Sequence, residues 1–184
     1  VELHGANGYL IEQFLNTASN QRTDRWGGTV ANRIRFAVEA ARRSAARIGA
    51  DRVGIRVSPY GAFNGMQPDP DHEALYAALA AELSALGLAY LHVVDHSSMG
   101  APKVTDTVKA ALRTGFKGTY ILSGGYDRAR AEADLVEGKG DLVAFGRPFL
   151  ANPDLVQKLA TGAALTAPDF ATFYTPGERG YTDY

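Results

Sequence analysis

The sequence predicts an α/β fold, a (β/α)8 TIM barrel of which this chain carries about the last five β/α units, strands four to eight. Short apolar segments alternate with longer amphipathic ones, and no hairpin signal joins two strands, which is typical of a parallel sheet. Polar residues gather where each strand ends, and barrel enzymes build their active sites at that rim. An open doubly wound sheet also fits the alternation, but the polar strand ends favour the barrel.

The first elements are expected within residues 1–49. Residues 1–3 are the end of a strand, and an irregular segment follows to about Gly28. Residues 30–49 carry apolar side chains at helical spacing, with the arginines mostly on the opposite face. The apolar face of this helix consists of Ile34, Ala37, Val38, Ala41 and Ala45.

Four more strands and helices alternate along the rest of the chain. The strands are nearly all apolar, as expected when both faces of a sheet are covered, and they span residues 52–59, 88–95, 118–125 and 141–148. The helices span residues 69–87, 103–115, 127–140 and 152–162. The first of these helices opens with Asp-Pro and stops at Gly87, and the tail from Ala167 has no period.

The number of strands is too small for a closed barrel. A complete barrel needs eight strands and about 250 residues. The chain has 184 residues and five β/α units, so we expect residues 1–184 to be the C-terminal part of one barrel domain whose first three strands are absent. We also expect a complementary N-terminal polypeptide to cover the open edge strands, since unpaired edges otherwise aggregate.

Composition narrows the class of protein. A net charge of −1 gives no general attraction to nucleic acid or to anionic membranes. The chain has no cysteine, which excludes disulfides and thiolate metal sites, and its histidines lack metal-ligand spacing. No apolar run approaches the roughly 20 residues of a membrane span. We therefore expect a cytoplasmic protein with no metal, membrane or nucleic-acid partner.

Two late loops are suited to binding phosphate. Ser123, Gly124 and Gly125 follow one strand and precede a helix, so their backbone N–H groups can form a concave anion site. Gly146 and Arg147 follow the next strand in the same way, and the arginine adds a planar fork of donors. Barrels usually bind phosphate after strands seven and eight. A phosphate-bearing ligand is favoured over two plain tight turns.

Other polar residues could carry chemistry. Arg56 lies in the middle of a strand, where its charge needs an internal salt bridge or a bound anion. His4 and Asn7 could aim two donors at one carbonyl oxygen, as an oxyanion hole does. The hydroxyl of Tyr9 could act as a general acid. A structural role for His4, Asn7 and Tyr9 is equally compatible with their spacing.

Taken together, these stretches resemble the old yellow enzyme family of FMN-dependent ene-reductases. Residues 1–36 look like the segment that begins at that family's fourth strand, almost position by position. Four more matching stretches follow in the family's order: "GIRVSP", "ILSGGY", "FGRPFLANPDLV" and "FYTPGERGYTDY". The resemblance covers essentially the whole chain.

The resemblance implies roles for matching residues. His4 and Asn7 correspond to the pair that hydrogen-bonds the carbonyl or nitro oxygen of the substrate, and Tyr9 corresponds to the proton donor. Arg56 matches the arginine beside the N1 and O2 edge of the flavin, where it stabilises the anionic reduced form. Tyr174 matches an aromatic residue of the substrate pocket. The implied cofactor-binding residues are Arg56, Ser123, Gly124, Gly125, Phe145, Gly146 and Arg147.

The implied activity is that of an ene-reductase. NADPH or NADH would reduce FMN, and FMN would then reduce the C=C bond of an enone, a maleimide or a nitroalkene. Two alternatives stay open. One is a phosphate-binding barrel lyase or isomerase without flavin, and the other is an inactive half-barrel that requires its complementary chain.

Overall fold

The structure, a computed structural model, describes residues 1–183 and contains one five-stranded sheet. Neighbouring strands are parallel, and their order across the sheet is their order along the chain. The strands are β1 (Glu2–Gly5), β2 (Gly54–Val57), β3 (Tyr90–Val94), β4 (Thr119–Ser123) and β5 (Leu142–Ala144). Each unit places its strand beside the preceding one, as successive units of a TIM barrel do, so the predicted fold class is confirmed.

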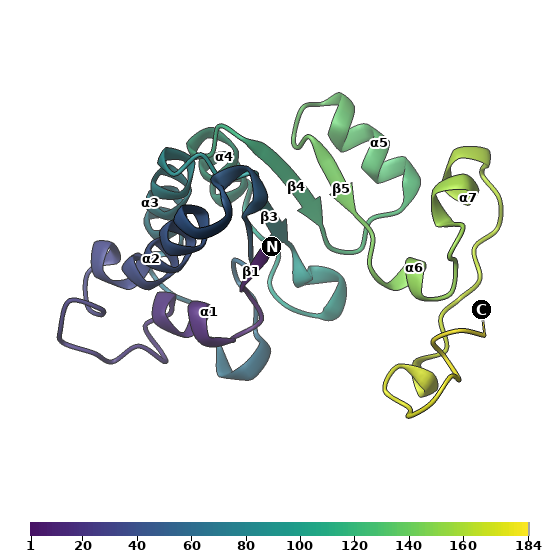
Figure 1. Cartoon of the computed structure of the whole chain (residues 1–184), viewed down its shortest axis with the longest axis horizontal. Coiled ribbons are helices and arrows are strands. Elements are labelled where there is room, and N and C mark those ends of the chain that lie inside the picture. The colour runs from purple at the N-terminus through teal and green to yellow at the C-terminus, as the bar shows by residue number, and fades with distance from the viewer. Residues whose placement is uncertain (184) are drawn as a thin grey trace.

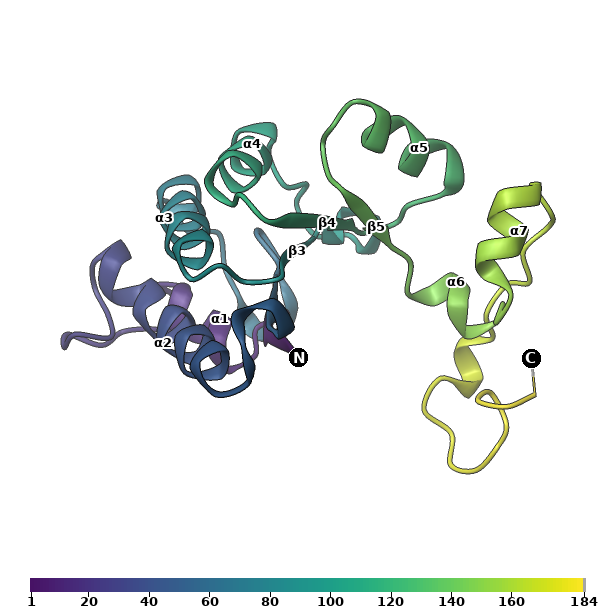
Figure 2. The ribbon, with the colours of Figure 1, turned by 45° about the horizontal axis from the view of Figure 1, so that its top comes forward.

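Helices cover one face of the sheet and leave the other face open (Figure 2). The long helices are α2 (Val30–Ile48), α3 (His72–Ala85), α4 (Asp106–Gly115), α5 (Arg128–Val136) and α7 (Leu155–Thr161). They form an arc outside the strands in the views of Figures 1 and 2. The chain therefore has the layering of part of a barrel wall, with strands on the inside and helices on the outside.

The core lies between the sheet and helices α2 to α4. Ile55, Leu91 and Tyr120 are paired in register on the helix-facing side of β2, β3 and β4, and all three are buried. Leu79 of α3 and Leu112 of α4 belong to the same buried cluster. Removing such apolar surface from water stabilises the fold by about 25 cal/mol per Å². The apolar spacing of each amphipathic segment therefore decides which of its faces meets the sheet.

Two short helices occur where the sequence predicts other structure. Helix α1 (Leu10–Leu15) lies within the segment expected to be irregular up to Gly28. Six residues are too few for helical periodicity to stand out in a sequence. Helix α6 (Arg147–Leu150) begins within residues 141–148, for which the sequence predicts strand throughout, and Pro148 in its first turn is well placed to start a helix.

One arginine of α2 does not lie on the exposed face predicted for it. Arg33 is 0% exposed, and its Nη1 donates to the Leu15 carbonyl at 2.6 Å and to Asp69 Oδ2 at 2.8 Å. Its Nη2 donates to Asp71 Oδ2 at 2.6 Å. A buried charge persists when it is paired and hydrogen-bonded. Arg33 thereby joins α2 to the end of α1 and to the segment that leads into α3.

The open face of the sheet is polar, although the sequence predicts strands that are nearly all apolar. His4, Arg56 and His92 are in register across β1, β2 and β3. His92 Nδ1 lies 2.9 Å from Glu2 Oε2, and its Nε2 lies 3.0 Å from Ser123 Oγ. These hydrogen bonds offset the cost of taking the polar groups out of water. The network lies on the inner wall, below the carboxyl ends of the strands.

Candidate active site

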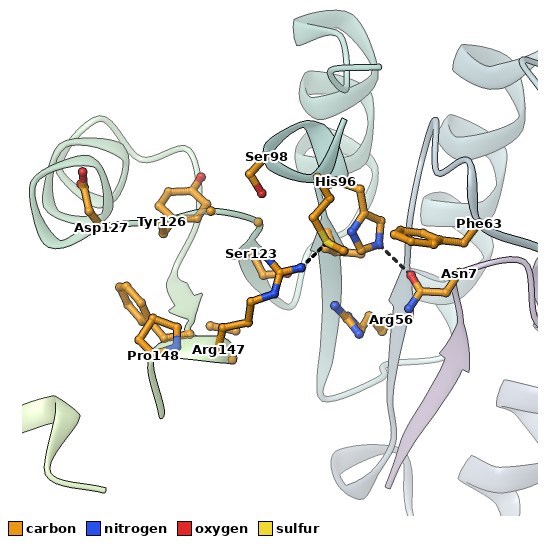
Figure 3. Close-up of a pocket in the computed structure, with 17 residues that line it drawn as sticks. Asn7, Arg56, Phe63, His96, Ser98, Ser123, Tyr126, Asp127, Arg147 and Pro148 are labelled. Atoms are coloured by element: carbon orange, nitrogen blue, oxygen red, sulfur yellow. Dashed lines mark hydrogen bonds between the residues drawn. The ribbon is translucent and has the colours of Figure 1, made fainter. Parts of the chain in front are cut away.

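A pocket of about 580 Å³ opens at the carboxyl ends of the strands (Figure 3). It is lined by the loops that follow all five strands and by Arg56 of β2; the loop after β2 contributes Phe63. The sequence-predicted residues that line it are Asn7, Arg56, Ser123, Gly124, Gly125, Phe145, Gly146 and Arg147. The parallel sheet thus brings to one place residues as far apart in the sequence as Asn7 and Arg147.

The loop after β4 requires glycine at two positions. Gly124 has a φ of +116°, and a Cβ there would lie 2.0 Å from the Asp95 carbonyl oxygen. Gly125 has a φ of +62°, and its Cβ would lie 2.6 Å from Ser98 Cβ. Only glycine adopts such backbone conformations readily in so little space. The loop can therefore lie directly against the loop after β3 and present its backbone to the pocket.

Two arginines add positive charge to the pocket. The Nε atom of Arg56 is buried and, among the described residues, has no hydrogen-bond partner. No carboxylate in residues 1–183 forms an ion pair with Arg56, so the structure does not contain the internal salt bridge considered from the sequence. Arg147 is exposed, and its Nη2 contacts Met99 Sδ across the pocket (Figure 3). Both guanidinium groups are available to an anionic or acceptor-rich ligand.

Asn7 is held firmly at the edge of the pocket. It has a φ of +59°, and its backbone N–H donates to Ser58 Oγ at 2.9 Å. Its carbonyl oxygen accepts a hydrogen bond of 2.7 Å from Asn64 Nδ2. The side-chain oxygen Oδ1 lies 2.6 Å from His96 Nε2, so the amide nitrogen faces the other way (Figure 3). The Nδ2 group is therefore the end that a ligand in the pocket would meet.

His96 is a pocket residue to which the sequence assigns no role. It is 7% exposed and lies edge-on against Phe63, with the ring centroids 4.9 Å apart. Burial lowers the pKa of its imidazole, and the positive charges of Arg56 and Arg147 lower it further. In the sequence, His96 directly follows the strand predicted at residues 88–95, and this position places it on the same rim as the other site residues.

His4 and Tyr9 lie next to each other but are not among the residues that line the pocket in the described chain. Their ring centroids are 5.0 Å apart, and Tyr9 is 53% exposed at the N-terminus of α1. Desolvation lowers the pKa of His4, and the Arg56 charge lowers it further, so its imidazole is neutral at neutral pH. His4 can then donate a hydrogen bond from one ring nitrogen.

The structure does not bring Tyr174 to the pocket. It is 94% exposed and follows the 3-10 turn η4 (Phe170–Thr172), in the segment that continues beyond α7. This segment is drawn in yellow and stands apart from the sheet in Figures 1 and 2. The substrate-binding role expected for Tyr174 therefore stays a prediction.

A family model described as "NADH:flavin oxidoreductase / NADH oxidase family" matches residues 1–166. The chain belongs to this family. It is 44% identical over 184 residues to a protein from Leishmania infantum named "Probable flavin mononucleotide-dependent alkene reductase", covering 100% of this chain and 49% of that protein. The chain spans about half the length of the curated relatives it matches.

Solved structures of flavin oxidoreductases are similar in fold. Morphinone reductase matches with a TM-score of 0.95 and 45% identity, over 100% of this chain and 49% of that one. An old yellow enzyme homologue from Zymomonas mobilis matches with a TM-score of 0.94 and 36% identity, over 100% of this chain and 52% of that one. The resemblance to old yellow enzymes is therefore confirmed.

The residues of this flavin-oxidoreductase pocket fit FMN. The glycine loop after β4 is shaped by its close contact with Asp95, which a Cβ would prevent. Arg56, whose Nε has no hydrogen-bond partner within residues 1–183, and the exposed Arg147 supply positive charge at two separate places on the wall. The FMN phosphate at one of these places and the flavin ring, which gains negative charge on reduction, at the other would complement the two positive charges.

No group of three or more potential metal ligands occurs within residues 1–183. In the same residues, no helix has the length and apolar composition that a membrane span requires.

Proposed function

We propose that residues 1–184 are the C-terminal part of a TIM-barrel ene-reductase that reduces activated C=C bonds with NADH or NADPH through FMN. The substrates would be α,β-unsaturated carbonyl or nitro compounds such as enones, maleimides and nitroalkenes. The observation that carries the proposal is the convergence of hydrogen-bond donors on one pocket, where Asn7, Arg56 and Arg147 meet the glycine loop. The relatives named alkene reductase and morphinone reductase support it.

The residues after β4 and β5 would hold the cofactor. Backbone N–H groups of Gly124, Gly125 and Gly146 would bind the phosphate together with Arg147, with Ser123 and Phe145 beside them. Arg56 would lie at the edge of the ring system and offset the negative charge that the ring gains on reduction. Bound FMN would supply the hydride that reaches the β-carbon of the alkene.

The residues after β1 would prepare the substrate. Asn7 Nδ2 and a ring nitrogen of His4 would donate hydrogen bonds to the carbonyl or nitro oxygen and draw electron density toward it. Tyr9, which stands beside His4, would donate a proton to the α-carbon. Tyr174 would line the substrate pocket if its segment folds over the rim in the complete barrel.

An N-terminal half would complete the barrel. Strands β1 and β5 are the edges of the sheet, and within residues 1–183 each has one neighbouring strand. Relatives of about twice the length have room for the three further strands that a barrel needs. The cytoplasmic location stays a prediction, and the proposal takes either NADPH or NADH as the reductant.

The test is to produce residues 1–184 with and without a matched N-terminal half taken from a relative. We expect the pair to copurify with flavin absorbance and to oxidise NADH or NADPH when an enone is added. The chain by itself should aggregate or melt without cooperativity and should bind FMN weakly. A colourless complex with lyase or isomerase activity would support the flavin-free alternative. A soluble, cooperatively melting monomer with submicromolar FMN affinity would show that the chain needs no complement.

A further inference from the structure

The amide of Asn7 can present either of two opposite groups to the pocket. Rotation by about 180° about its last bond exchanges a hydrogen-bond donor for an acceptor, with little change in shape. Only the donor can bind the carbonyl or nitro oxygen of the proposed substrate. A pocket that depends on this residue therefore needs a second group to fix the orientation of the amide.

His96 is placed to fix that orientation. Its Nε2 lies 2.6 Å from Asn7 Oδ1, and an amide oxygen can only accept a hydrogen bond. The Nε2 atom must then carry the proton. If the amide were rotated, its NH2 group would face the N–H of His96, and two donors would meet at hydrogen-bond distance. With the proton on Nε2, the contact therefore favours the orientation in which Nδ2 faces the pocket (Figure 3).

His96 is itself held rigidly. It is the first residue of the 3-10 turn η3 (His96–Met99), which is capped by Asp95 Oδ1 accepting from the Ser97 N–H at 3.0 Å. The imidazole lies edge-on against Phe63, and Asn64, the next residue after Phe63, donates to the backbone carbonyl of Asn7. The turn at residues 63–65 therefore supports both partners of the contact.

We propose that His96 is a positioning residue that holds the Asn7 amide with its donor toward the pocket, so that the site selects substrates whose activating group is a hydrogen-bond acceptor. This inference rests on the proposed function. In this proposal His96 does not transfer a proton to the substrate. The proposal requires the Nε2–H tautomer when the imidazole is neutral. In that tautomer and in the protonated imidazolium alike Nε2 carries a proton, so the charged groups that face His96, Arg56, Asp95 and Arg147, can shift its titration without releasing the amide.

The test compares two substitutions at His96 in the FMN-loaded, completed barrel. His96→Leu removes the donor, so the amide rotates freely, and kcat/KM for an enone should fall by roughly 5- to 100-fold, mainly through KM. His96→Gln restores an N–H donor and should recover most of that loss. The rate of flavin reduction by NADH should stay the same in both variants. Equal losses in the two variants would overturn the proposal.

A double-mutant cycle tests whether His96 affects kcat/KM through the Asn7 amide. In an Asn7→Ala background, His96→Leu should change kcat/KM by less than about twofold, because no amide is left to orient. If His96→Leu lowered kcat/KM in the Asn7→Ala background as much as in the wild-type background, the proposal would be overturned. His72→Gln is the matched control, since His72 is also 7% exposed but packs between Tyr60 and Tyr76, outside the pocket. It should leave kcat/KM at the wild-type value.

If the His96→Leu variant does not fold, the proposal can still be tested by a measurement on the wild-type protein that needs no catalysis. Nitrogen-15 NMR of the wild-type complex should show the Nε2–H tautomer of His96, and a bare Nε2 would overturn the proposal. Failure of this inference and failure of the proposed function give different experimental results. If wild-type protein binds no FMN and reduces no alkene, the proposed function fails, whereas an active wild type with an indifferent His96→Leu variant refutes only the inference.

Discussion

The Asn7 turn after β1 is hydrogen-bonded to the loops after β2 and β3, whereas Arg147 after β5 is exposed on the other side of the pocket. Asn7 is held by Ser58, Asn64 and His96, so the loop after β2 and the loop after β3 together fix its side chain and its backbone. On the other side, Arg147 is exposed, and within residues 1–183 its side chain hydrogen-bonds only the sulfur of Met99. One side of the pocket is preorganised by the chain, and the other is prepared for a ligand.

The same contrast extends to packing. The side chains between β1–β4 and helices α2–α4 form a continuous buried core. From β5 onward, large apolar residues are exposed: Leu142 at 53%, Val156 at 71%, Phe170 at 68% and Tyr174 at 94%. Exposed apolar surface of this extent marks a site of interaction. The comparison indicates that contacts within the chain hold the Asn7 side of the pocket, whereas the segment from β5 onward exposes apolar side chains to further contacts.

The largest effect is expected on the preorganised side, from Tyr9→Phe. Losing the proposed general acid should slow alkene reduction by about 10²- to 10⁴-fold and leave reduction of the flavin by NADH or NADPH unchanged. Stopped-flow traces of the two half-reactions measure this directly. Tyr60→Phe is the control, because the Tyr60 ring stacks on His72 and not on His4. Equal losses in both half-reactions would contradict the role of Tyr9.

His4→Ala tests the partner of Asn7. In the proposed site a phenolic inhibitor would place its oxygen where the substrate carbonyl lies, and losing one donor to a charged oxygen should weaken binding by roughly 1.5–3 kcal/mol. Titration of the flavin absorbance with the inhibitor gives the dissociation constant. An unchanged constant would make His4 a structural residue of β1.

On the cofactor side, Gly124→Ala should weaken FMN binding by about 1–3 kcal/mol, because a Cβ and a positive φ are both costly at this position. Gly138→Ala is the matched control, since Gly138 has a φ of +71° but a Cβ there would meet nothing within 4 Å. Fluorescence titration with FMN should show the loss for Gly124→Ala alone. Equal losses would mean that backbone strain, and not the close contact with Asp95, is responsible.

A smaller, pH-dependent effect is expected from Glu12, which lies behind the Asn7 turn. Its carboxylate accepts from the Gly8 N–H at 2.6 Å and from Ser58 Oγ at 2.9 Å, and burial raises its pKa to about 7. The folded protein then binds more protons than the unfolded chain between the ordinary glutamate pKa and about 7. Stability should therefore fall as pH rises through this window, by on the order of 1–3 kcal/mol.

Glu12→Gln should remove this pH dependence. Urea unfolding of the completed barrel at several pH values should show a flatter profile for the variant than for the wild type. If the free energy of unfolding changed equally with pH in both proteins, between the ordinary glutamate pKa and neutral pH, Glu12 would be ionised in the folded protein.

Much of this fold follows from local patterns. Helical spacing predicts the five long helices, and apolar runs bounded by turn residues predict the five strands. Periodicity does not reveal helix α1 because it is short, and it extends β5 too far because the last residues of that apolar run begin α6. Within the site, Asn7, Arg56 and the two glycine loops are predicted and do line one pocket. His96 receives no role from the sequence, and His4, Tyr9 and Tyr174 do not line that pocket among the described residues.

By itself, the sequence determines the order of the elements, the glycine positions that a close backbone contact requires and the presence of donors at the strand ends. The tertiary structure decides which donors meet. Residues 7 and 96 come together because β1, β2 and β3 pair in parallel and bring their carboxyl ends to one rim. Arg33 is buried because Asp69 and Asp71 pair with it from another segment. Periodicity reports the local backbone and the buried face, whereas a hydrogen bond between distant residues depends on strand register, which a local pattern does not contain.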